Sequence, residues 1–441
     1  MRSKIYRKLR GCCSLFYGRS ARLLSERISL SIQPLRHEIA LCRVRRKADS
    51  GQRIRVVFLA TYASVWKYDR IYKILEQNPR FEVSILTCPV VNVGRAKMLS
   101  EMKKADALFR GRGYSELLAY DEARDEYIDI ARDLRPDLLF YTNPYKGLID
   151  DRYYIDRFRS TLTCYVPYSF FATDDRKMYD SQFFNSAWRV FCETDYHERE
   201  IASVQRRRGR NVVSLGYPGC DAFANGSNVA IPGPWRPDAS PRKHLIWAPH
   251  WLPLETFLRD AMFFLELAKD YESVLQIALK PHPLLCGALE KVPGWGVEAA
   301  QAYFESWRSS ASTILVEGDY TDLFLTSDAL VHNSGSFLSE YLVTRKPALF
   351  IGADNEYMVN GSKYSAGQIK WNAYGKDAIA KHYIAASQDQ IRSFIERVVL
   401  SGDDYMKNQR NEFVDHVILR SGGGSSSERI VGYIKDELGI A

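Results

Sequence analysis

The sequence is 441 residues long and lacks the features that mark several common classes of protein. No apolar run reaches the length of about 18 residues that a membrane-spanning helix requires. The N-terminus has no continuous apolar stretch between a basic start and a small-residue cleavage site, so no secretory signal is predicted. The eight cysteines show neither Cys-x-x-Cys pairs nor metal-ligand spacing, which indicates reduced, buried thiols. We therefore expect a cytoplasmic protein without a disulfide framework.

The sequence has no excess of positive charge outside its N-terminal 50 residues. Residues 1–50 contain thirteen lysines and arginines against three acids, a balance of +10, so the remaining 391 residues carry −2 of the net charge of +8. A nearly neutral body argues against a nucleic-acid groove. The basic segment instead predicts an anionic surface as its partner.

Residues 1–50 have the pattern of a basic amphipathic helix. Lysines and arginines lie between apolar residues that recur at spacings of three and four, namely Ile5, Leu9, Cys12, Leu15 and Phe16. A helix of this kind lies on anionic phospholipid, where each basic residue near the surface contributes about 1 kcal/mol. We expect this extension, assigned to residues 1–52, to hold the protein peripherally on the inner face of the plasma membrane. A solvated leader and a helix that packs on the body are the alternatives.

From Arg53 onward, short apolar runs alternate with stretches of helical pattern. Runs that predict strands are 54–60, 81–86, 137–141, 163–166, 190–192 and 212–215, and then 244–248, 275–280, 312–316, 329–331 and 347–351. Between the two sets, residues 225–242 are rich in Pro, Gly, Ser and Asn and predict a linker. Alternating strands and helices imply parallel sheets. We therefore expect an α/β protein with the layout of a GT-B fold, in which two Rossmann-like domains, residues 53–224 and 243–441, face a cleft.

The turn His332-Asn333-Ser334-Gly335-Ser336 has the features of a diphosphate site. It follows a predicted strand and precedes a predicted helix over 337–343, and ligands of α/β sheets bind at the carboxyl ends of strands. The first helical turn offers unpaired N–H groups and a positive dipole end, Gly335 allows close backbone approach, and the hydroxyls of Ser334 and Ser336 add hydrogen bonds. Glu340, one turn further on, can accept from ribose hydroxyls. An ordinary serine N-cap is the alternative interpretation.

Lys280 and His282 follow another predicted strand, in the motif Leu279-Lys280-Pro281-His282-Pro283. The two prolines stiffen the turn and remove two backbone donors, so we expect both side chains at the end of the strand. A lysine there can neutralise phosphate. A histidine can donate a hydrogen bond to phosphate or move a proton near neutral pH.

Two further motifs complete the predicted site. His250, in Trp247-Ala248-Pro249-His250-Trp251, follows the first strand of the second domain and is the candidate general base, while Trp247 is expected in the core. The turn Asp319-Tyr320-Thr321 can contact a nucleobase. Asp322 beside it can instead cap the helix that follows.

In this order and at this spacing, the motifs resemble the CDP-glycerol glycerophosphotransferase family, the teichoic-acid-polymerase-like GT-B enzymes. The resemblance covers about residues 243–430, through WAPHW, LKPHPLL, GDYTDLFLTSDALVHNSGSFLSEYL and TRKPALF. It implies a transferase that moves a glycerophosphoryl-type group from a CDP-activated alcohol to a cell-surface polysaccharide or lipid-linked acceptor and releases CMP. On the matching positions His282 would contact the donor phosphates, and Ser334, Gly335 and Ser336 would bind the pyrophosphate.

Departures from the family pattern concern the base. Polymerase-type members carry a Trp-His-Gly-Thr-Pro-Leu-Lys run in the N-terminal domain, whereas this chain has Tyr165-Val166-Pro167-Tyr168-Ser169-Phe170 in roughly that place. Asn333 stands where many members have an acidic residue. His250 is therefore the candidate base, with Asp174 or Asp175 as alternatives. No Asp-x-Asp motif lies near these residues, so we expect no metal and no other cofactor, with Lys280, His282 and the helix dipole stabilising the leaving CMP.

Two other functions stay open on the sequence alone. A GT-B glycosyltransferase that uses a UDP- or GDP-sugar is the enzymatic alternative, because a helix N-terminus recognises only the diphosphate. A non-catalytic protein of the same shape, which binds nucleotide or glycan and scaffolds a glycan-assembly complex, is the other.

Overall fold

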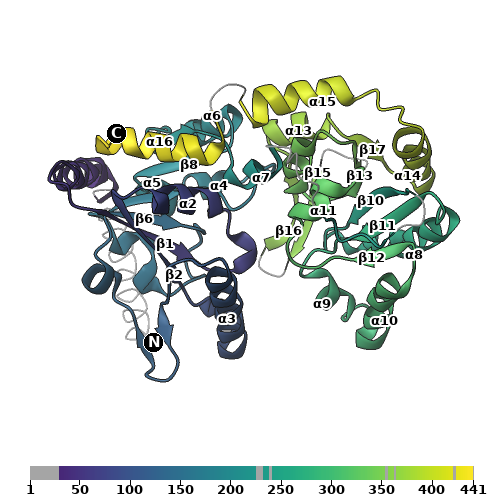
Figure 1. Cartoon of the computed structure of the whole chain (residues 1–441), viewed down its shortest axis with the longest axis horizontal. Coiled ribbons are helices and arrows are strands. Elements are labelled where there is room, and N and C mark those ends of the chain that lie inside the picture. The colour runs from purple at the N-terminus through teal and green to yellow at the C-terminus, as the bar shows by residue number, and fades with distance from the viewer. Residues whose placement is uncertain are drawn as a thin grey trace, which may run out of the picture.

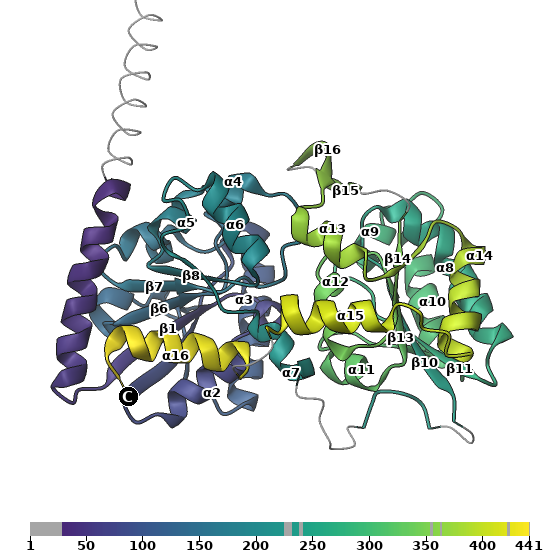
Figure 2. The ribbon, with the colours of Figure 1, turned by 90° about the horizontal axis from the view of Figure 1, so that it is seen from above.

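The computed structural model describes residues 29–440 apart from 225–231, 238–240, 353–355, 362–363 and 421–423. Two parallel sheets lie side by side, each flanked by helices, as Figures 1 and 2 show. We call the first sheet with its helices the first lobe, and the second sheet with its helices the second lobe.

The first sheet has seven strands in the order β3-β2-β1-β6-β7-β8-β9. They are β1 (Ile54–Ala60), β2 (Phe81–Thr87), β3 (Glu116–Leu118), β6 (Leu138–Tyr141), β7 (Leu162–Tyr165), β8 (Arg189–Cys192) and β9 (Val212–Ser214). Every residue of β6 and β7 is buried, as expected for central parallel strands covered on both faces. All predicted runs of this half form strands, and the edge strand β3 is an addition.

The second sheet has six strands in the order β12-β11-β10-β13-β14-β17. They are β10 (Lys243–Ala248), β11 (Leu275–Leu279), β12 (Thr313–Leu315), β13 (Ala329–His332), β14 (Ala348–Ile351) and β17 (Tyr383–Ala385). The predicted runs again form strands, and β17 at the edge is an addition. Two hairpins lie outside the sheets, β4 (Tyr120–Asp121) with β5 (Glu126–Tyr127) and β15 (Glu356–Gly361) with β16 (Tyr364–Lys370).

Helices connect the strands of each sheet. Those between β1 and β10 are α2 (Asp69–Gln77), α3 (Arg95–Gly111), α4 (Arg176–Tyr179), α5 (Gln182–Ser186), α6 (Asp195–Val204) and α7 (Asp221–Ala224). Those after β10 are α8 (Leu254–Asp270), α9 (Leu285–Leu289), α10 (Gly296–Ser309), α11 (Thr321–Thr326), α12 (Phe337–Glu340), α13 (Ala373–Ile379), α14 (Gln388–Phe394), α15 (Lys407–Phe413) and α16 (Ser426–Leu438). Short 3₁₀ and π-helical turns lie between them.

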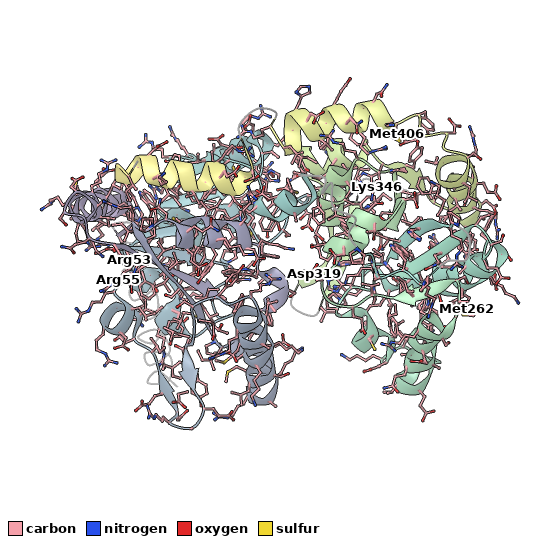
Figure 3. The ribbon with its side chains drawn as sticks, in the orientation of Figure 1. Arg53, Arg55, Met262, Asp319, Lys346 and Met406 are labelled. Carbon is pink, nitrogen blue, oxygen red and sulfur yellow. The ribbon has the colours of Figure 1, made fainter. Side chains whose placement is uncertain are left out.

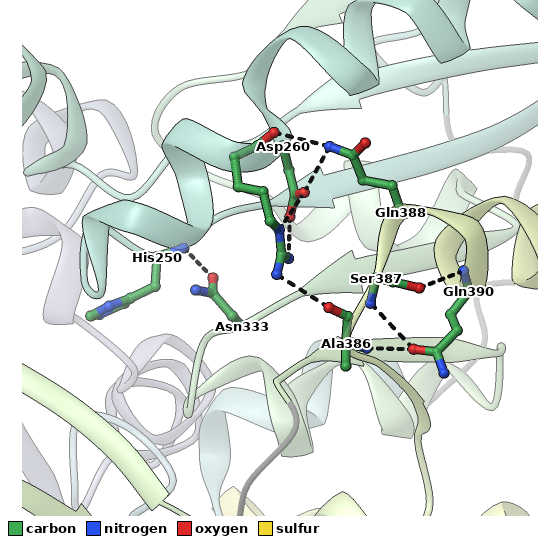
Figure 4. A network of polar contacts seen from close by, with 8 residues as sticks. His250, Asp260, Asn333, Ala386, Ser387, Gln388 and Gln390 are labelled. Atoms are coloured by element: carbon green, nitrogen blue, oxygen red, sulfur yellow. Dashed lines mark hydrogen bonds and ion pairs between the residues drawn. The ribbon is translucent and has the colours of Figure 1, made fainter.

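Buried polar contacts join helices of the second lobe. Figure 4 shows the carboxylate of Asp260 on α8, which is buried and accepts hydrogen bonds from Arg259 at 2.8 and 2.7 Å. The side-chain amide of Gln388, at the start of α14, reaches the same carboxylate at 3.4 Å. Together these bonds fix α14 against α8.

In both sheets the strand order reverses at one point. β1 pairs with β2 on one side and with β6 on the other, and β10 pairs in the same way with β11 and β13. In open parallel sheets ligands bind outside the carboxyl ends of the strands at such a reversal. The turns after β10 and β13, which contain His250 and Ser334, lie at the reversal of the second sheet.

Both ends of the described chain pack on the first lobe, which differs from the division drawn from the sequence. Residues 29–49 form a helix, with Ala40 and Val44 in the core of the first lobe. α16 (yellow in Figure 1) crosses back from the second lobe and places Ile430 in the same core. This part of the predicted extension is therefore a helix that packs on the body, because one of its faces is apolar enough to complete the core. Residues 1–28 lie outside the described residues.

The two lobes also touch along a close-packed seam. The ring of Phe170 in the first lobe stacks on Tyr374 of α13, with centroids 5.3 Å apart. The backbone N–H of Asn372 donates to the carbonyl of Ala172 at 3.0 Å. A Cβ on Gly375 would lie 2.1 Å from that carbonyl oxygen, so only glycine permits this approach of α13.

No helix among the described residues combines the length and apolarity needed to cross a membrane. The thiols follow the expectation in part. Those of Cys88, Cys164, Cys192 and Cys220 are free and buried, Cys286 is half-buried, and Cys42 is exposed. Cys12 and Cys13 lie outside the described residues.

The start of α16 generates a prediction about stability. A capping box of Ser425 and Glu428 is present at its N-terminus, and the buried carboxylate of Asp221 also accepts the backbone N–H groups of Ser426 and Ser427, both at 2.9 Å. Asp221→Ala should lower the free energy of unfolding by about 2–4 kcal/mol, because two buried donors lose a charged acceptor. Chemical denaturation measures the change. The matched control is Asp403→Ala, which removes an exposed ion pair with Arg397 and should cost less than about 1 kcal/mol; equal losses for both variants would contradict the assignment.

Candidate functional site

Three predicted motifs meet at the strand reversal of the second sheet. The backbone N–H of His282 donates to the carbonyl of Pro249 at 3.2 Å, which places the turn after β11 beside the turn after β10. The backbone N–H of His250 donates to Oδ1 of Asn333 at 2.6 Å and so joins the turn after β13, as Figure 4 shows. Asn333 thus positions the turn that carries His250.

His250 and His282 form a pair of neutral imidazoles. Their ring centroids are 4.6 Å apart, with the planes at 65°. Burial lowers the pKa of His250 to about 4. Burial, with the charges of His250 and Lys280 added to it, lowers the pKa of His282 to about 3. At neutral pH each ring therefore has one N–H and one unprotonated nitrogen.

Backbone contacts favour different tautomers for the two rings. Nδ1 of His250 lies 2.8 Å from the carbonyl oxygen of Leu252 and 3.2 Å from its nitrogen. The shorter contact assigns the proton to Nδ1 and leaves Nε2 as the acceptor. Nδ1 of His282 accepts the N–H of Leu284 at 3.1 Å, which assigns the proton of this ring to Nε2. His250 therefore presents an acceptor, and His282 a donor.

Lys280 is a buried ammonium without a matching carboxylate. Its exposed fraction is 5%, and burial lowers the pKa of its amine, an effect that the charges of Glu317 and Asp319 oppose. In the described part of the chain no carboxylate lies within ion-pair distance of it. Nζ lies 5.9 Å from the ring centroid of Tyr320. Because an unpaired buried charge costs several kcal/mol, this position is suited to an anionic ligand.

The serine turn is present, but the helix behind it is shorter than predicted. The Oγ atoms of Ser334 and Ser336 are 3.1 Å apart, and Ser334 is buried. The predicted helix over 337–343 is replaced by α12, which ends at Glu340, and by a 3₁₀ turn over Leu342–Thr344. So short a helix has a small dipole, and the polar groups that the turn itself offers are its hydroxyl and N–H groups.

Gly335 has no packing requirement inside the protein. A Cβ at this position would meet the ring of Trp371 at 3.7 Å, an ordinary van der Waals contact. Close approach of a ligand to the backbone therefore remains the reason for the predicted role of this glycine.

Glu340 takes part in a contact between the lobes. Its carboxylate accepts the hydroxyl of Tyr320, and the hydroxyl of Tyr217 lies 3.5 Å from its other oxygen. Lys67, from the first lobe, donates to the hydroxyl of Tyr320 at 3.0 Å. With an exposed fraction of 1%, the Glu340 carboxylate is occupied by protein groups. This differs from the predicted role of accepting ribose hydroxyls.

The turn before α11 faces the first lobe. Figure 3 places Asp319 where the two lobes face each other. Its carboxylate accepts the N–H of Thr321 at 2.8 Å, and Asp322 is exposed. Asp319 therefore satisfies the backbone at the start of α11, where the sequence had offered Asp322 as a cap. The ring of Tyr320 packs on Phe324, with centroids 4.8 Å apart.

The alternative bases of the first lobe have structural partners. Asp175 accepts the N–H of Met178 at 3.2 Å and caps α4, while Asp174 pairs with Arg176 at 3.2 Å. The sequence did not identify Glu193, a buried carboxylate at the end of β8 that accepts the N–H of Phe171 at 3.0 Å. It supports the segment that meets α13.

Among the described residues, no group of three or more His, Cys, Asp or Glu side chains is arranged to hold a metal ion. The cationic groups of the site are instead the amines of Lys280 in the second lobe and Lys67 in the first. Both lie beside the ring of Tyr320, with Nζ of Lys67 at 5.1 Å from its centroid. Opposite lobes thus supply the two charges.

Comparisons with known proteins identify the fold. No protein-family model matches the chain, and no curated protein matches it in sequence. Among solved structures, a variant of the wall teichoic acid polymerase TagF has a TM-score of 0.55 at 13% identity, over 88% of this chain and 89% of that chain. The UDP co-structure of S. aureus MnaA has a TM-score of 0.52 at 14% identity, over 88% and 98%. UDP-GlcNAc 2-epimerase from Neisseria meningitidis, bound to UDP-GlcNAc, gives 0.53 at 12%, over 87% and 100%.

At these identities the likeness shows the fold alone. The chain has a GT-B fold with two Rossmann-like domains, which confirms the predicted fold class.

The buried charge of Lys280 generates a prediction that separates binding from stability. Lys280→Met should leave the unfolding temperature unchanged or raise it by a few degrees, because the variant removes an unpaired buried ammonium and keeps an apolar side chain of similar length. Thermal unfolding followed by circular dichroism measures this.

The matched control is Lys346→Met, at a lysine that is half-buried and is labelled in Figure 3. Burial lowers the pKa of Lys346 to about 8, but its Nζ donates to the carbonyls of Phe324 and Leu325 at 3.0 and 2.7 Å. Its loss should cost about 1–3 kcal/mol, because two acceptors lose their donor. Destabilisation by Lys280→Met as large as that by Lys346→Met would show that Lys280 is a structural residue.

Proposed function

We propose that the protein is a transferase that moves a glycerophosphoryl-type group from a CDP-activated alcohol, such as CDP-glycerol, to a cell-surface polysaccharide or lipid-linked acceptor. The observation that carries the proposal is the buried amine of Lys280, at the same strand reversal as two neutral imidazoles and a serine turn. An activated donor brings a diphosphate, the anion whose charge and size such a site suits.

The reaction needs one bond to form and one to break. The acceptor hydroxyl oxygen attacks the β-phosphorus, the bond from that phosphorus to the bridging oxygen breaks, and CMP leaves with the bonding electrons. The acceptor proton passes to Nε2 of His250, the unprotonated nitrogen of that ring. Negative charge from the bound phosphates raises the pKa of this imidazole and so favours the transfer.

Side-chain and backbone groups of the turns stabilise the charge that develops on the phosphates. His282 donates from Nε2, and Lys280 contributes its positive charge. The hydroxyls of Ser334 and Ser336 and the backbone N–H groups around Gly335 hold the pyrophosphate. The turn Asp319-Tyr320-Thr321 borders the nucleoside end of the donor. Lys67 faces this turn from the first lobe and is a second cation that the phosphates can reach.

The comparisons support a nucleotide-linked donor without deciding which one. One structure of TagF, at 13% identity and a TM-score of 0.54, was obtained after a soak with CDPG. The structures of S. aureus MnaA and of the Neisseria meningitidis epimerase described above contain UDP and UDP-GlcNAc, respectively. CDP-glycerol is favoured here by the motifs of the second lobe, in particular by Lys280 and His282 in the turn between two prolines.

Two alternatives rest on the same site. A glycosyltransferase with a UDP- or GDP-sugar would use the same diphosphate contacts and would release UDP or GDP. A non-catalytic scaffold of a glycan-assembly complex would bind nucleotide without turnover. The product released therefore distinguishes all three functions.

We also propose that the protein works peripherally at the inner face of the plasma membrane, with residues 1–50 on anionic lipid. Eight lysines and arginines against one acid in residues 1–28 support this partner. A lipid-linked acceptor would be reached from such a position. Residues 29–49 are part of the first lobe, so only one face of that helix is available to a membrane.

The proposed chemistry predicts CMP release that depends on His282. Purified protein given CDP-glycerol and acceptor should release CMP, and His282→Ala should lower kcat by at least about 100-fold, because the variant loses a donor to the transferred phosphate. Chromatography of the nucleotides measures the product. His416→Ala, at an exposed histidine on the second lobe, is the matched control and should keep the wild-type rate. Release of UDP from a UDP-sugar in place of CMP would overturn the donor assignment, and nucleotide binding without any release would favour the scaffold.

A further inference from the structure

The outer face of the helix over residues 29–49 carries an apolar stripe. Ile32, Leu35 and Ile39 are 40%, 63% and 63% exposed, respectively. Their spacing of three and four residues places them on one side of the helix. The opposite side is buried in the first lobe through residues such as His37 and Val44. Figure 2 shows this helix at the outer edge of the first lobe, on the side away from the second lobe.

Arginines lie beside this stripe on the helix and on the neighbouring loop. Arg43 and Arg46 are exposed on the helix. Arg43 donates to the carbonyl of Ser160 at 3.0 Å, and Arg159 contacts the hydroxyl of Ser29, so the loop that contains Arg157 and Arg159 lies against the helix.

A second basic segment, the turn Arg206-Arg207-Arg208-Gly209-Arg210, lies near the same helix. Arg207 binds the carbonyl of Ala187, and the next residue, Trp188, packs in the same core as Ala40 and Val44 of the helix. Burial, with the charges of Arg207 and Arg189 added to it, lowers the pKa of His37 to about 3. The turn is rigidly built. Arg207 donates to the carbonyls of Asn185 and Ala187 at 3.2 and 3.1 Å, and Gly209 has a φ of 71° with Ala202 packed against it.

The arginines of this turn differ in their partners. Arg206 pairs with Asp180 at 3.1 Å. Arg208 and Arg210 are exposed, and among the described residues neither has a carboxylate within ion-pair distance. The exposed acids of the helix are Glu38 and Asp49. By helical periodicity they lie on the flank of the stripe opposite Arg43.

We propose that the stripe of Ile32, Leu35 and Ile39 and the arginine turn 206–210 form one docking face for an anionic lipid bilayer. The inference rests on the proposed membrane partner and extends it from the N-terminal segment to the folded first lobe. Apolar side chains enter the boundary between headgroups and acyl chains, while guanidinium groups bind the lipid phosphates. A rigid turn and a packed helix present both sets of groups without a further cost of ordering.

Charge favours a bilayer over a second copy of the chain as the occupant. Pairing two stripes would bring Arg43 and Arg46 of both copies together, and like charges at an interface are unfavourable. Residues 1–28, which lead directly into this helix, add eight basic residues against one acid. The face and the segment before it thus have the same sign of charge, opposite to that of an anionic leaflet.

Co-sedimentation of the full chain with vesicles tests the proposal. The probes are vesicles of phosphatidylglycerol with phosphatidylcholine, and vesicles of phosphatidylcholine alone, at low and high salt. Two double variants test the two parts of the face separately. The apolar variant combines Leu35→Gln and Ile39→Gln, and the arginine variant combines Arg208→Gln and Arg210→Gln. The arginine variant should lower the partition coefficient on anionic vesicles about tenfold or more, because each arginine near the surface contributes about fivefold. The apolar variant should lower it by a similar factor, because it removes side chains that enter the boundary between headgroups and acyl chains. The arginine variant should also lose much of its salt dependence.

Matched controls lie on the second lobe. Met262→Gln removes an apolar side chain that is 58% exposed, and Lys291→Gln removes an exposed charge. Both controls should bind vesicles like the wild type, and thermal unfolding should show that all variants fold. CMP release from CDP-glycerol measured without vesicles should be the same in every variant, so the chemistry and the docking face can fail separately.

Three outcomes would overturn the docking face. One is wild-type partitioning of both double variants, which would leave membrane contact to residues 1–28 alone. Another is equal binding to neutral vesicles. The third is a dimer in sedimentation velocity that the Leu35 and Ile39 double variant converts to monomer without a change in vesicle binding, which would assign the stripe to a second copy of the chain.

Discussion

The contact between the two lobes through Tyr320 and Glu340 is the constraint on which the geometry of the site depends. Tyr320 donates to a fully buried carboxylate of its own lobe and accepts from Lys67 of the other, while Tyr217 approaches the same carboxylate. Breaking this set would leave a buried charge with too few donors, which costs several kcal/mol. The close approach of Gly375 to Ala172 fixes the seam at a second place. With both contacts made, the carboxyl ends of the first and second sheets face each other.

The site between them combines the positive charges of Lys280 and Lys67 with neutral donors and acceptors. Burial keeps both imidazoles neutral at neutral pH. Their backbone partners leave Nε2 of His250 as an acceptor and Nε2 of His282 as a donor. A site of four cations would bind diphosphate but would offer no group to take a proton. The division into two ammonium groups and two neutral imidazoles allows charge stabilisation and proton transfer to occur side by side.

Much of the fold was predictable because buried parallel strands appear in the sequence as apolar runs, whereas β3 and β17 are short and lie at sheet edges, where this signal is weak. His250, His282 and Ser334 could be grouped because the carboxyl ends of neighbouring strands meet. Lys67, Tyr217 and Glu193 escaped prediction because their contacts join segments distant in the sequence or depend on the seam. Periodicity also cannot distinguish an amphipathic helix that lies on a bilayer from one that packs on a protein core. The packing of residues 29–49 on the first lobe could therefore be seen only in the structure.

The proposed function requires that Lys280 and its neighbours bind the diphosphate of a cytidine nucleotide. Isothermal titration of the wild-type protein with CDP and with cytidine tests it most directly, because the two ligands differ only in the diphosphate. CDP should bind at least about 100-fold more tightly than cytidine, since the phosphates contribute about 3 kcal/mol or more through charged hydrogen bonds. Lys280→Met should remove most of this difference. Equal affinities for CDP and cytidine, or an unchanged difference in the variant, would contradict the proposed diphosphate site.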